Sequence, residues 1–129
     1  MRLTAKKAYE NAKISPGEVD VAQVHDCFSI SEIIEMEELG FCKKGEGGSF
    51  VDSGQTKMGG KIPTNTDGGL LSCGHPFGAT GIRQAIEILR QLQGRAVHQV
   101  DRATVGLTHN LSGANVEQTI VIYSREPKK

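Results

Sequence analysis

Residues 65–81 read NTDGGLLSCGHPFGATG, and the clearest indications of chemistry in the chain lie within them. Small residues crowd His75 on both sides, and glycine at this density permits positive φ angles and close approach of the backbone to a ligand. Pro76 stiffens the backbone beside the imidazole. A rigid imidazole on a glycine-lined turn suits an oxyanion donor or a general base.

A helix is predicted directly after this turn. Apolar residues recur at helical spacing over residues 82–92, and Gly94 ends the pattern. They fall on one stripe, made of Ile82, Ala85, Ile86, Leu89 and Leu92. The imidazole of His75 therefore lies just before the start of a strong helix.

A helix and a strand are predicted near the N-terminus. Small residues at helical spacing predict a helix over residues 3–14, which Ser15-Pro16-Gly17 ends. A valine-rich run over residues 19–24 predicts a short buried strand. The polar residues His25-Asp26-Cys27 follow at the end of that strand. α/β folds tend to place their chemistry where a strand ends and a helix begins.

The next helix is expected to begin at Ser29. Glu32 lies three residues on, which predicts a capping box, and Gly40 is the expected residue just past the helix end. Residues 41–67 show no clear period and contain many glycines. A loop of this length is usually functional or covered by a partner.

The C-terminal part reads as two strands. Residues 103–107 and 116–123 are β-branched and apolar, and a turn is predicted at 109–113. Two strands joined in this way can pair antiparallel. Together with the earlier elements they predict an α/β layered domain with a mixed sheet over residues 1–124, followed by a polar tail at 125–129.

Composition excludes several classes of function. The 129 residues fit one domain, and 15 basic residues balance 15 acidic ones, so no global charge favours nucleic acid or a membrane surface. Trp is absent, which disfavours a stacking platform for single strands. No apolar run is long enough to span a bilayer, and no signal peptide is recognisable. Three irregularly spaced cysteines predict a reducing compartment, so we expect a cytoplasmic location.

Three polar clusters fall at turns or element ends: His25-Asp26-Cys27, Cys73-Gly74-His75 and His109-Asn110. A lone histidine is more often structural or solvated, and only His75 carries a functional prediction by itself. A zinc site is disfavoured because there is no CxxC pair and the spacings match no zinc ribbon or finger, so no metal site is predicted. A phosphate loop is disfavoured because the glycines do not form GxxxxGK[ST].

Three motifs occur in a fixed order along the chain. The pattern Asn65-x-x-Gly68-Gly69 followed by Gly74-His75-Pro76-x-Gly78-Ala79-x-Gly81 resembles the signature of the C-terminal domain of thiolases. The segment HDCF at residues 25–28 resembles the variant of sterol-carrier-protein-type thiolases and their archaeal relatives, where most thiolases have NEAF. His109-Asn110-Leu111 resembles the HN(L/V)G loop that replaces the CxG loop in this branch.

The resemblance covers residues 3–124 and implies a fold and a reaction. The implied fold is the C-terminal half of the thiolase fold, a βαβαβαββ unit with a mixed five-stranded sheet flanked by helices. Thiolases join or cleave acyl groups through a covalent acyl-cysteine, so the implied activity is acyl transfer to or from coenzyme A by Claisen or retro-Claisen chemistry. The coenzyme A thioester is then the substrate, and no other cofactor is expected.

The resemblance also implies roles for single residues. His75 matches the histidine that activates the nucleophilic cysteine and binds a thioester oxygen. Cys27 matches the cysteine that acts as acid and base, a role that suits a thiol because the ordinary thiol pKa of about 8.5 is not far from neutrality. His25 takes the place of the asparagine that helps to hold a water in an oxyanion hole. Cys42 and Cys73 match no family role.

Four further residues are implied as substrate-binding, namely His109, Asn110, Gly74 and Gly113. His109 and Asn110 belong to the loop that lines the same cavity as His75. After Leu111 the chain reads Ser-Gly-Ala-Asn where relatives often have a glycine-rich stretch, so this loop departs from the family pattern.

The nucleophilic cysteine of the family is absent, because none of the three cysteines lies in a CxS motif. The expected partner is therefore a thiolase N-terminal half, as a separate chain or a further domain, and the chain alone is expected to be inactive. A large surface should face that half, and an oligomer is expected. The alternative is a non-catalytic acyl-CoA-binding or scaffold subunit of a thiolase-like or aldolase complex.

Overall fold

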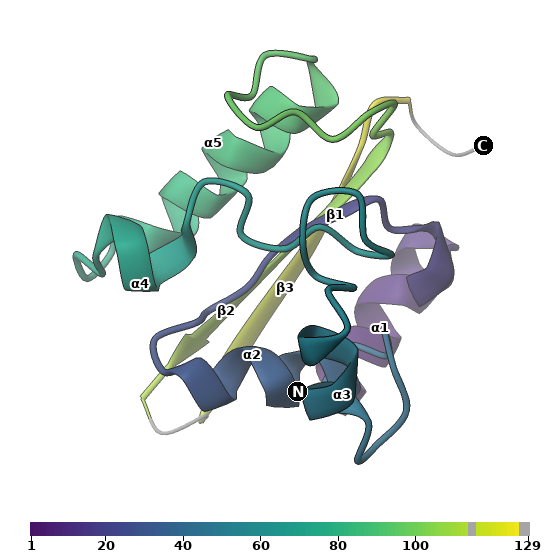
Figure 1. Ribbon diagram of the computed structural model, residues 1–129, viewed down its shortest axis with the longest axis vertical. Coiled ribbons are helices and arrows are strands. Elements are labelled where there is room, and N and C mark those ends of the chain that lie inside the picture. Colours follow the sequence, from purple (N-terminus) through teal and green to yellow (C-terminus); the bar gives the residue numbers. More distant parts are fainter. Residues whose placement is uncertain (114–115, 127–129) are drawn as a thin grey trace.

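The computed structural model describes residues 1–113 and 116–126, which form a small mixed sheet with helices on both faces (Figure 1). The strands are β1 (Val21–Gln23), β2 (Val105–Ser112) and β3 (Glu117–Ser124). They lie in the order β1-β2-β3, with β1 parallel to β2 and β2 antiparallel to β3. The parallel pair means that β1 and β2 end at the same edge of the sheet.

The helices divide between the two faces (Figure 1). They are α1 (Arg2–Ala12), α2 (Ser29–Glu38), α3 (Gly47–Asp52), α4 (Gly69–Cys73) and α5 (Thr80–Leu92), with a 3₁₀ turn η1 (Pro16–Glu18) after α1. In Figure 1, α1, α2 and α3 lie on one side of the strands and α4 and α5 on the other. None of the helices in the described ranges has the length and apolar character needed to cross a lipid bilayer.

The larger core lies between the sheet and the helices α1 and α2. Ala22 and Leu107 point to this side from neighbouring strands and are fully buried. They pack in one cluster with Tyr9 of α1 and Met36 of α2. Alternation along β2 sends residue 106 to the opposite face, where α5 packs.

The smaller core lies beneath α5 and depends on a glycine in β2. Ile88 and Leu92 of α5 pack with Val21 there. A Cβ atom at Gly106 would lie 2.4 Å from Cγ2 of Ile88, far inside van der Waals contact. Glycine at this position therefore allows α5 to approach the sheet closely.

Helix α5 carries apolar residues on its outward side as well as on the side that packs against the sheet. Its apolar stripe faces outward, with Ile82, Ile86 and Leu89 exposed at 63%, 44% and 45%. Its inward face instead buries Gln84 and Gln91. Hydrogen bonds satisfy much of this polar layer, including those from Gln91 Nε2 to the carbonyl of His98 and from Gln84 Nε2 to the carbonyl of His109. The predicted helix is confirmed, but its predicted stripe divides: Leu92 is buried against the sheet, whereas Ile82, Ile86 and Leu89 are exposed.

The described residues form three strands where five were predicted. A further strand is reduced to one parallel bridge between Thr64 and Ala22. Pro63 has no N–H to donate, and Asn65 takes a positive φ of 50°, which ends the extended run. The element order, helix first and two strands last, otherwise follows the predicted mixed α/β pattern.

Three local predictions were wrong. The turn predicted at 109–113 is mostly strand, because β2 stays paired with β3 as far as Ser112 opposite Glu117. The capping box predicted at Ser29 is absent, since Phe28 occupies the cap position without a side-chain bond. The segment 41–67 is not a continuous loop, because it contains α3.

Candidate functional site

A cavity of about 700 Å³ opens at the edge of the sheet where β1 and β2 end. Three segments line it: the residues after β1, the turn before α5 together with its first turn, and the end of β2. Parallel neighbouring strands deliver their C-terminal residues to one place, so this edge is where an α/β fold gathers a site. The side chains that line it include His25, Cys27, His75, Phe77, Thr80 and Asn110.

The rings of His25 and His75 meet inside this cavity. Their centroids lie 4.7 Å apart at an interplanar angle of 88°, an edge-to-face contact. The ring of Phe77 packs on the other side of His75 at 5.1 Å. His25 is buried and His75 is exposed, so one imidazole is held by the protein while the other faces outward.

A threonine at the start of α5 orients His75. The Nδ1 atom of His75 lies 2.6 Å from Oγ1 of Thr80, which is 2% exposed. That hydroxyl also donates to the carbonyl of Pro76 at 3.5 Å. It therefore accepts the Nδ1–H of His75, and we assign the free lone pair to Nε2, the atom available for base chemistry.

The pKa of His25 is lowered from its ordinary value. Burial lowers its pKa first, and the neighbouring His75 and His109 lower it further. The hydrogen bond to Asn110 and the charge of Asp26 only partly oppose this effect. Because Oδ1 of Asn110 can only accept, Nδ1 of His25 donates to it, and Nε2 keeps its lone pair.

Cys27 lines the same cavity as a partly buried free thiol. Its Sγ lies 3.9 Å from Oγ of Ser31, one turn into α2. Cys42 and Cys73 are also free thiols, and neither lines this cavity.

At the end of β2, the side chain of Asn110 lines the cavity, while the side chain of His109 lies on the opposite face of the sheet. Asn110 accepts from His25 and also from the N–H of Leu111. The fully buried ring of His109 lies on the α2 side, with Nδ1 3.2 Å from Oε1 of Glu35 and Nε2 2.5 Å from Oε1 of Gln118. Burial raises the pKa of Glu35, and the contact with His109 partly offsets that increase. Of the predicted pair, Asn110 therefore meets the cavity and His109 lies behind the strand.

Glycines let the three segments converge. Gly74 and Gly78 take φ angles of 81° and 82°, which turn the chain on either side of His75. A Cβ atom at Gly81 would lie 2.9 Å from Nδ2 of Asn110, so glycine lets α5 begin against β2. Gly113 has a φ of 57° and lines the cavity rim, whereas Gly74 does not line it.

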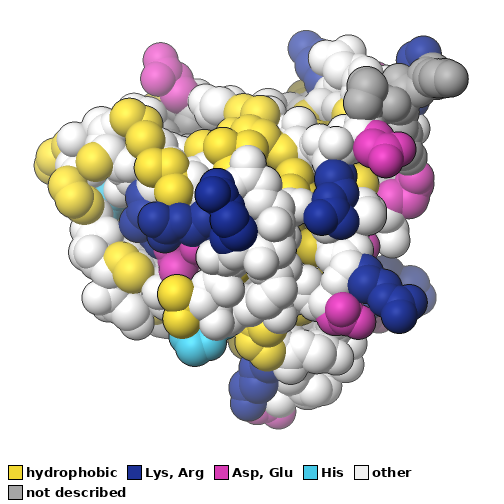
Figure 2. All heavy atoms as spheres, turned by 90° about the horizontal axis from the view of Figure 1, so that it is seen from above, with side chains coloured by type: hydrophobic (Ala, Val, Ile, Leu, Met, Phe, Trp, Pro, Cys, Tyr) yellow, Lys and Arg dark blue, Asp and Glu magenta, His cyan; other side chains and the backbone are white. Residues whose placement is uncertain are grey.

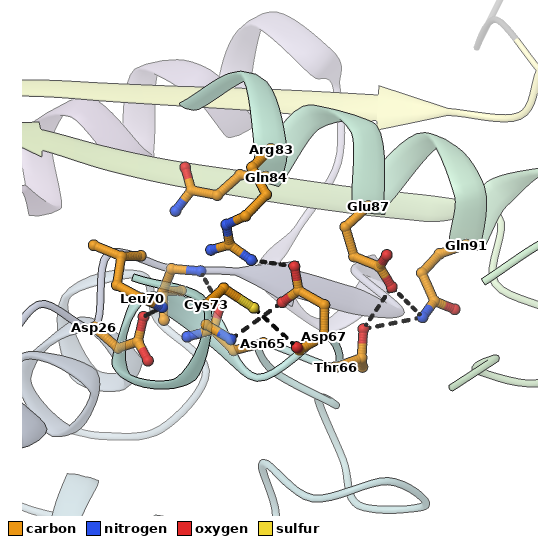
Figure 3. A network of polar contacts seen from close by, with 12 residues as sticks. Asp26, Asn65, Thr66, Asp67, Leu70, Cys73, Arg83, Gln84, Glu87 and Gln91 are labelled. Atoms are coloured by element: carbon orange, nitrogen blue, oxygen red, sulfur yellow. Dashed lines mark hydrogen bonds and ion pairs between the residues drawn. The ribbon is translucent and has the colours of Figure 1, made fainter. Parts of the chain in front are cut away.

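A polar network anchors the segment between β1 and α5, as Figure 3 shows. Arg83 of α5 forms an ion pair with Asp67, and Oε1 of Glu87 accepts from Thr66 at 3.1 Å. Oδ1 of Asn65 accepts the N–H of Val24 at 2.9 Å, which fixes the first motif against β1. The bulk of the sequence motif therefore acts as scaffold around His75.

Sequence reasoning missed Thr80 and the contacts of Asp26. Thr80 lies five residues after His75 within the motif, and Asp26 lies within HDCF, so both were quoted without a role. Their function becomes visible only through hydrogen bonds that join distant segments. No group of three or more His, Cys, Asp or Glu side chains suited to a metal ion occurs in the described part of the chain.

Comparison with known proteins identifies relatives along almost the whole chain. A family model described as thiolase C-terminal domain-like matches residues 1–125. Acetyl-CoA acetyltransferase from Methanothermobacter thermautotrophicus is 48% identical over 122 residues, which is 94% of this chain and 32% of that protein. Sterol carrier protein 2 from Rattus norvegicus is 49% identical over 108 residues, which is 83% of this chain and 20% of that protein.

A solved structure shares the fold. The chain titled Ltp2-ChsH2(DUF35) aldolase superposes with a TM-score of 0.82 at 28% identity, covering 96% of this chain and 31% of that one. The chain thus spans about a third or less of the proteins it matches. The resemblance inferred from the three motifs is confirmed, and the chain belongs to the thiolase C-terminal domain-like family.

Proposed function

We propose that this chain is the C-terminal part of an acyltransferase of the thiolase type, acting on coenzyme A thioesters by Claisen or retro-Claisen chemistry. The observation that carries the proposal is the convergence of His25, Cys27, His75 and Asn110 on one cavity. A Claisen reaction needs a nucleophile, a base for the α-carbon proton and donors for the thioester oxygens. The cavity offers the second and third of these.

His75 acts on the nucleophile that the other half supplies. Its Nε2 lone pair, fixed by Thr80 at Nδ1, takes the thiol proton of a partner cysteine as that sulfur attacks the thioester carbonyl. The acyl group then moves from coenzyme A to the partner cysteine. The resulting imidazolium faces the thioester oxygen and stabilises the charge that develops there.

Cys27 acts as the base and acid for the proton of the substrate α-carbon. As a thiolate it removes a proton from the α-carbon of the substrate, and as a thiol it returns a proton to the departing sulfur or carbon. His25, whose pKa is lowered mainly by burial and whose ring is held by Asn110, presents Nε2 to a water that donates to the enolate oxygen. Asn110 is thus a positioning residue for His25.

The other half is proposed to dock on the outward stripe of α5. Ile82, Ile86 and Leu89 form this stripe, and the cavity rim continues it with Phe28 and Phe77, which are 70% and 93% exposed. Figure 2 shows hydrophobic side chains gathered on one face of the molecule, with Lys and Arg among them. Contiguous exposed apolar surface beside an open site favours a covering partner. The completed enzyme is proposed to be an oligomer.

The test is a chimera in which this chain replaces the corresponding third of the Methanothermobacter acetyl-CoA acetyltransferase. We expect thiolysis of acetoacetyl-CoA by the chimera and none by the isolated chain. His75→Ala and Cys27→Ser should each lower kcat by at least about 100-fold, the scale of a lost acid or base. Cys42→Ser, at a thiol outside the cavity, is the matched control and should leave kcat unchanged.

A second candidate is a non-catalytic acyl-CoA-binding or scaffold subunit of a thiolase-like or aldolase complex. The superposition on the chain titled as an aldolase favours it. Full turnover by the His75→Ala chimera, with acyl-CoA binding retained, would support this candidate over catalysis. Three free thiols suit a reducing compartment, so a cytoplasmic location is proposed for either function.

A further inference from the structure

We propose that Asp26 is a positioning residue that joins the segment carrying His25 and Cys27 to the segment carrying His75. This inference rests on the proposed function for its significance and on geometry for its evidence. Asp26 lies between two cavity residues but does not itself line the cavity. It is 3% exposed, so its carboxylate must be satisfied inside the protein.

The partner of Asp26 is the backbone at the start of α4. Oδ1 of Asp26 accepts the N–H of Leu70 at 2.7 Å, a short bond between a carboxylate and an amide (Figure 3). Leu70 is 4% exposed, so water competes little for this bond. The contact joins residues that lie far apart in sequence, on either side of the long segment 41–67.

Gly69 shows how closely the two segments approach. A Cβ atom at this position would lie 2.2 Å from Oδ2 of Asp26 and 2.7 Å from its Oδ1. Gly69 also takes a φ of 64°, which L side chains rarely adopt. Both oxygens of Asp26 therefore lie against the backbone of residues 69–70, and a side chain at position 69 would force the carboxylate and this backbone apart.

A second carboxylate holds α4 from the other side. Oδ1 of Asp67 accepts the N–H of Gly69 at 3.1 Å, and Oδ2 of Asp67 pairs with Arg83 of α5. Asp67 thus ties the start of α4 to α5, while Asp26 ties it to the end of β1. Helix α4 is only five residues long and leads through Gly74 into His75.

The consequence concerns the relative placement of Cys27 and His75. Cys27 follows Asp26 directly, and His75 lies one short helix beyond Leu70. Displacement of α4 would move His75 relative to both Cys27 and the ring of His25. Removal of the Asp26 carboxylate should therefore loosen the 4.7 Å contact between the two histidine rings.

The experiment uses NMR on the full chain. In Asp26→Ala, we expect loss of the cross-relaxation between the ring protons of His25 and His75. We also expect exchange of the Leu70 amide to become at least about tenfold faster, because a bond to a charged acceptor is among the stronger hydrogen bonds. Asp26→Asn retains an acceptor oxygen and should restore the ring contact in part.

Asp20→Ala is the matched control. Oδ2 of Asp20 also accepts two backbone N–H groups, those of Thr104 at 2.7 Å and Val105 at 2.9 Å, but at the opposite end of β1. It should lower the thermal midpoint to a similar extent and leave the histidine contact unchanged. An equal loss of that contact in Asp20→Ala, or its full retention in Asp26→Ala, overturns the proposal.

Gly69→Ala tests the same contact from the opposite side and serves if Asp26→Ala fails to fold. It should push α4 away from Asp26 and abolish the ring contact, and wild-type ring contacts in this variant would contradict the proposal. Turnover plays no part in these measurements. An inactive chimera with the NMR effects present would refute the proposed function alone.

Discussion

His25 and His75 meet edge to face at 4.7 Å, although they come from opposite sides of the longest irregular segment of the chain. Each ring is fixed through its Nδ1 atom, His25 by Asn110 and His75 by Thr80. The two Nε2 atoms are left with their lone pairs. The site therefore presents two imidazoles whose ring orientation is set by neighbours, and the effect of each neighbour can be tested separately.

Thr80→Val should change the tautomer of His75. Valine keeps the shape of the side chain and removes the oxygen that accepts Nδ1–H, so the proton is no longer confined to Nδ1. We expect long-range ¹H–¹⁵N NMR spectra to show the ring nitrogens of His75 moving toward a mixture of both tautomers. Thr66→Val, which removes a hydroxyl bonded to Glu87 instead, should leave these shifts unchanged.

His25 should make stability fall on acidification. Its pKa is lowered in the folded chain, mainly by burial, so the unfolded chain binds the proton first as pH falls. Stability is then fully present above the unfolded value of about 6.5 and is lost as pH falls from there through the lowered folded value. Urea titrations between about pH 7.5 and 5 should show this loss.

The matched variant for that titration is His25→Asn. It carries no proton in this range, so its stability should depend less on pH over the same interval than that of the natural chain. A stability curve for His25→Asn that runs parallel to the wild-type curve would show that His25 is not the source of the pH dependence.

Ile86→Glu should separate folding from association. Ile86 is 44% exposed on the outward stripe, and surface substitutions of this kind usually change stability within about 0.5 kcal/mol. A charge in the centre of an apolar contact should nevertheless weaken binding of a thiolase N-terminal half by at least about tenfold. Calorimetric titration measures this, with Arg90→Glu on an exposed position of the same helix as control. Equal affinities for both variants would place the docking surface elsewhere.

Gly106→Ala should destabilise the chain by about 1–3 kcal/mol through overpacking beneath α5. The added methyl would lie 2.4 Å from Cγ2 of Ile88, and neither the strand nor the helix can yield without losing its partners. Denaturant unfolding measures the cost. In the double variant Gly106→Ala/Ile88→Ala, part of the stability lost in Gly106→Ala should be recovered. Gly48→Ala, where a Cβ meets nothing within 4 Å, should be neutral or slightly stabilising.

The sequence predicted local features better than contacts between segments. The helices at the N-terminus and after His75 have strong 3.6-residue patterns, and both are present with ends shifted by one or two residues. The end of β2 was mistaken for a turn because Asn110 and Gly113 favour turns locally, whereas pairing with β3 keeps the strand extended. The conformational propensities of a short stretch of sequence carry no information about the pairing of β2 with β3.

In the candidate site too, the sequence indicated local features better than contacts between segments. The motifs singled out His75, Cys27 and Asn110, and these three residues line one cavity. They could not show that the ring of His109 lies behind the strand, because a shift of one residue along a strand changes the face. Nor could they show that the apolar stripe of α5 points outward, because periodicity reveals a stripe but not the side that it covers.

The exposed apolar stripe of α5 should make the cellular abundance of this domain depend on the abundance of the surface that covers it. A chain with Ile82, Ile86 and Leu89 at its surface resembles a partly unfolded protein to the chaperones and proteases that survey a cell. Copies made in excess of the covering surface would be held or degraded, and copies matched to it would persist. The abundance of this domain in the cell should therefore follow that of its covering surface, whether that surface comes from the same polypeptide or from another one.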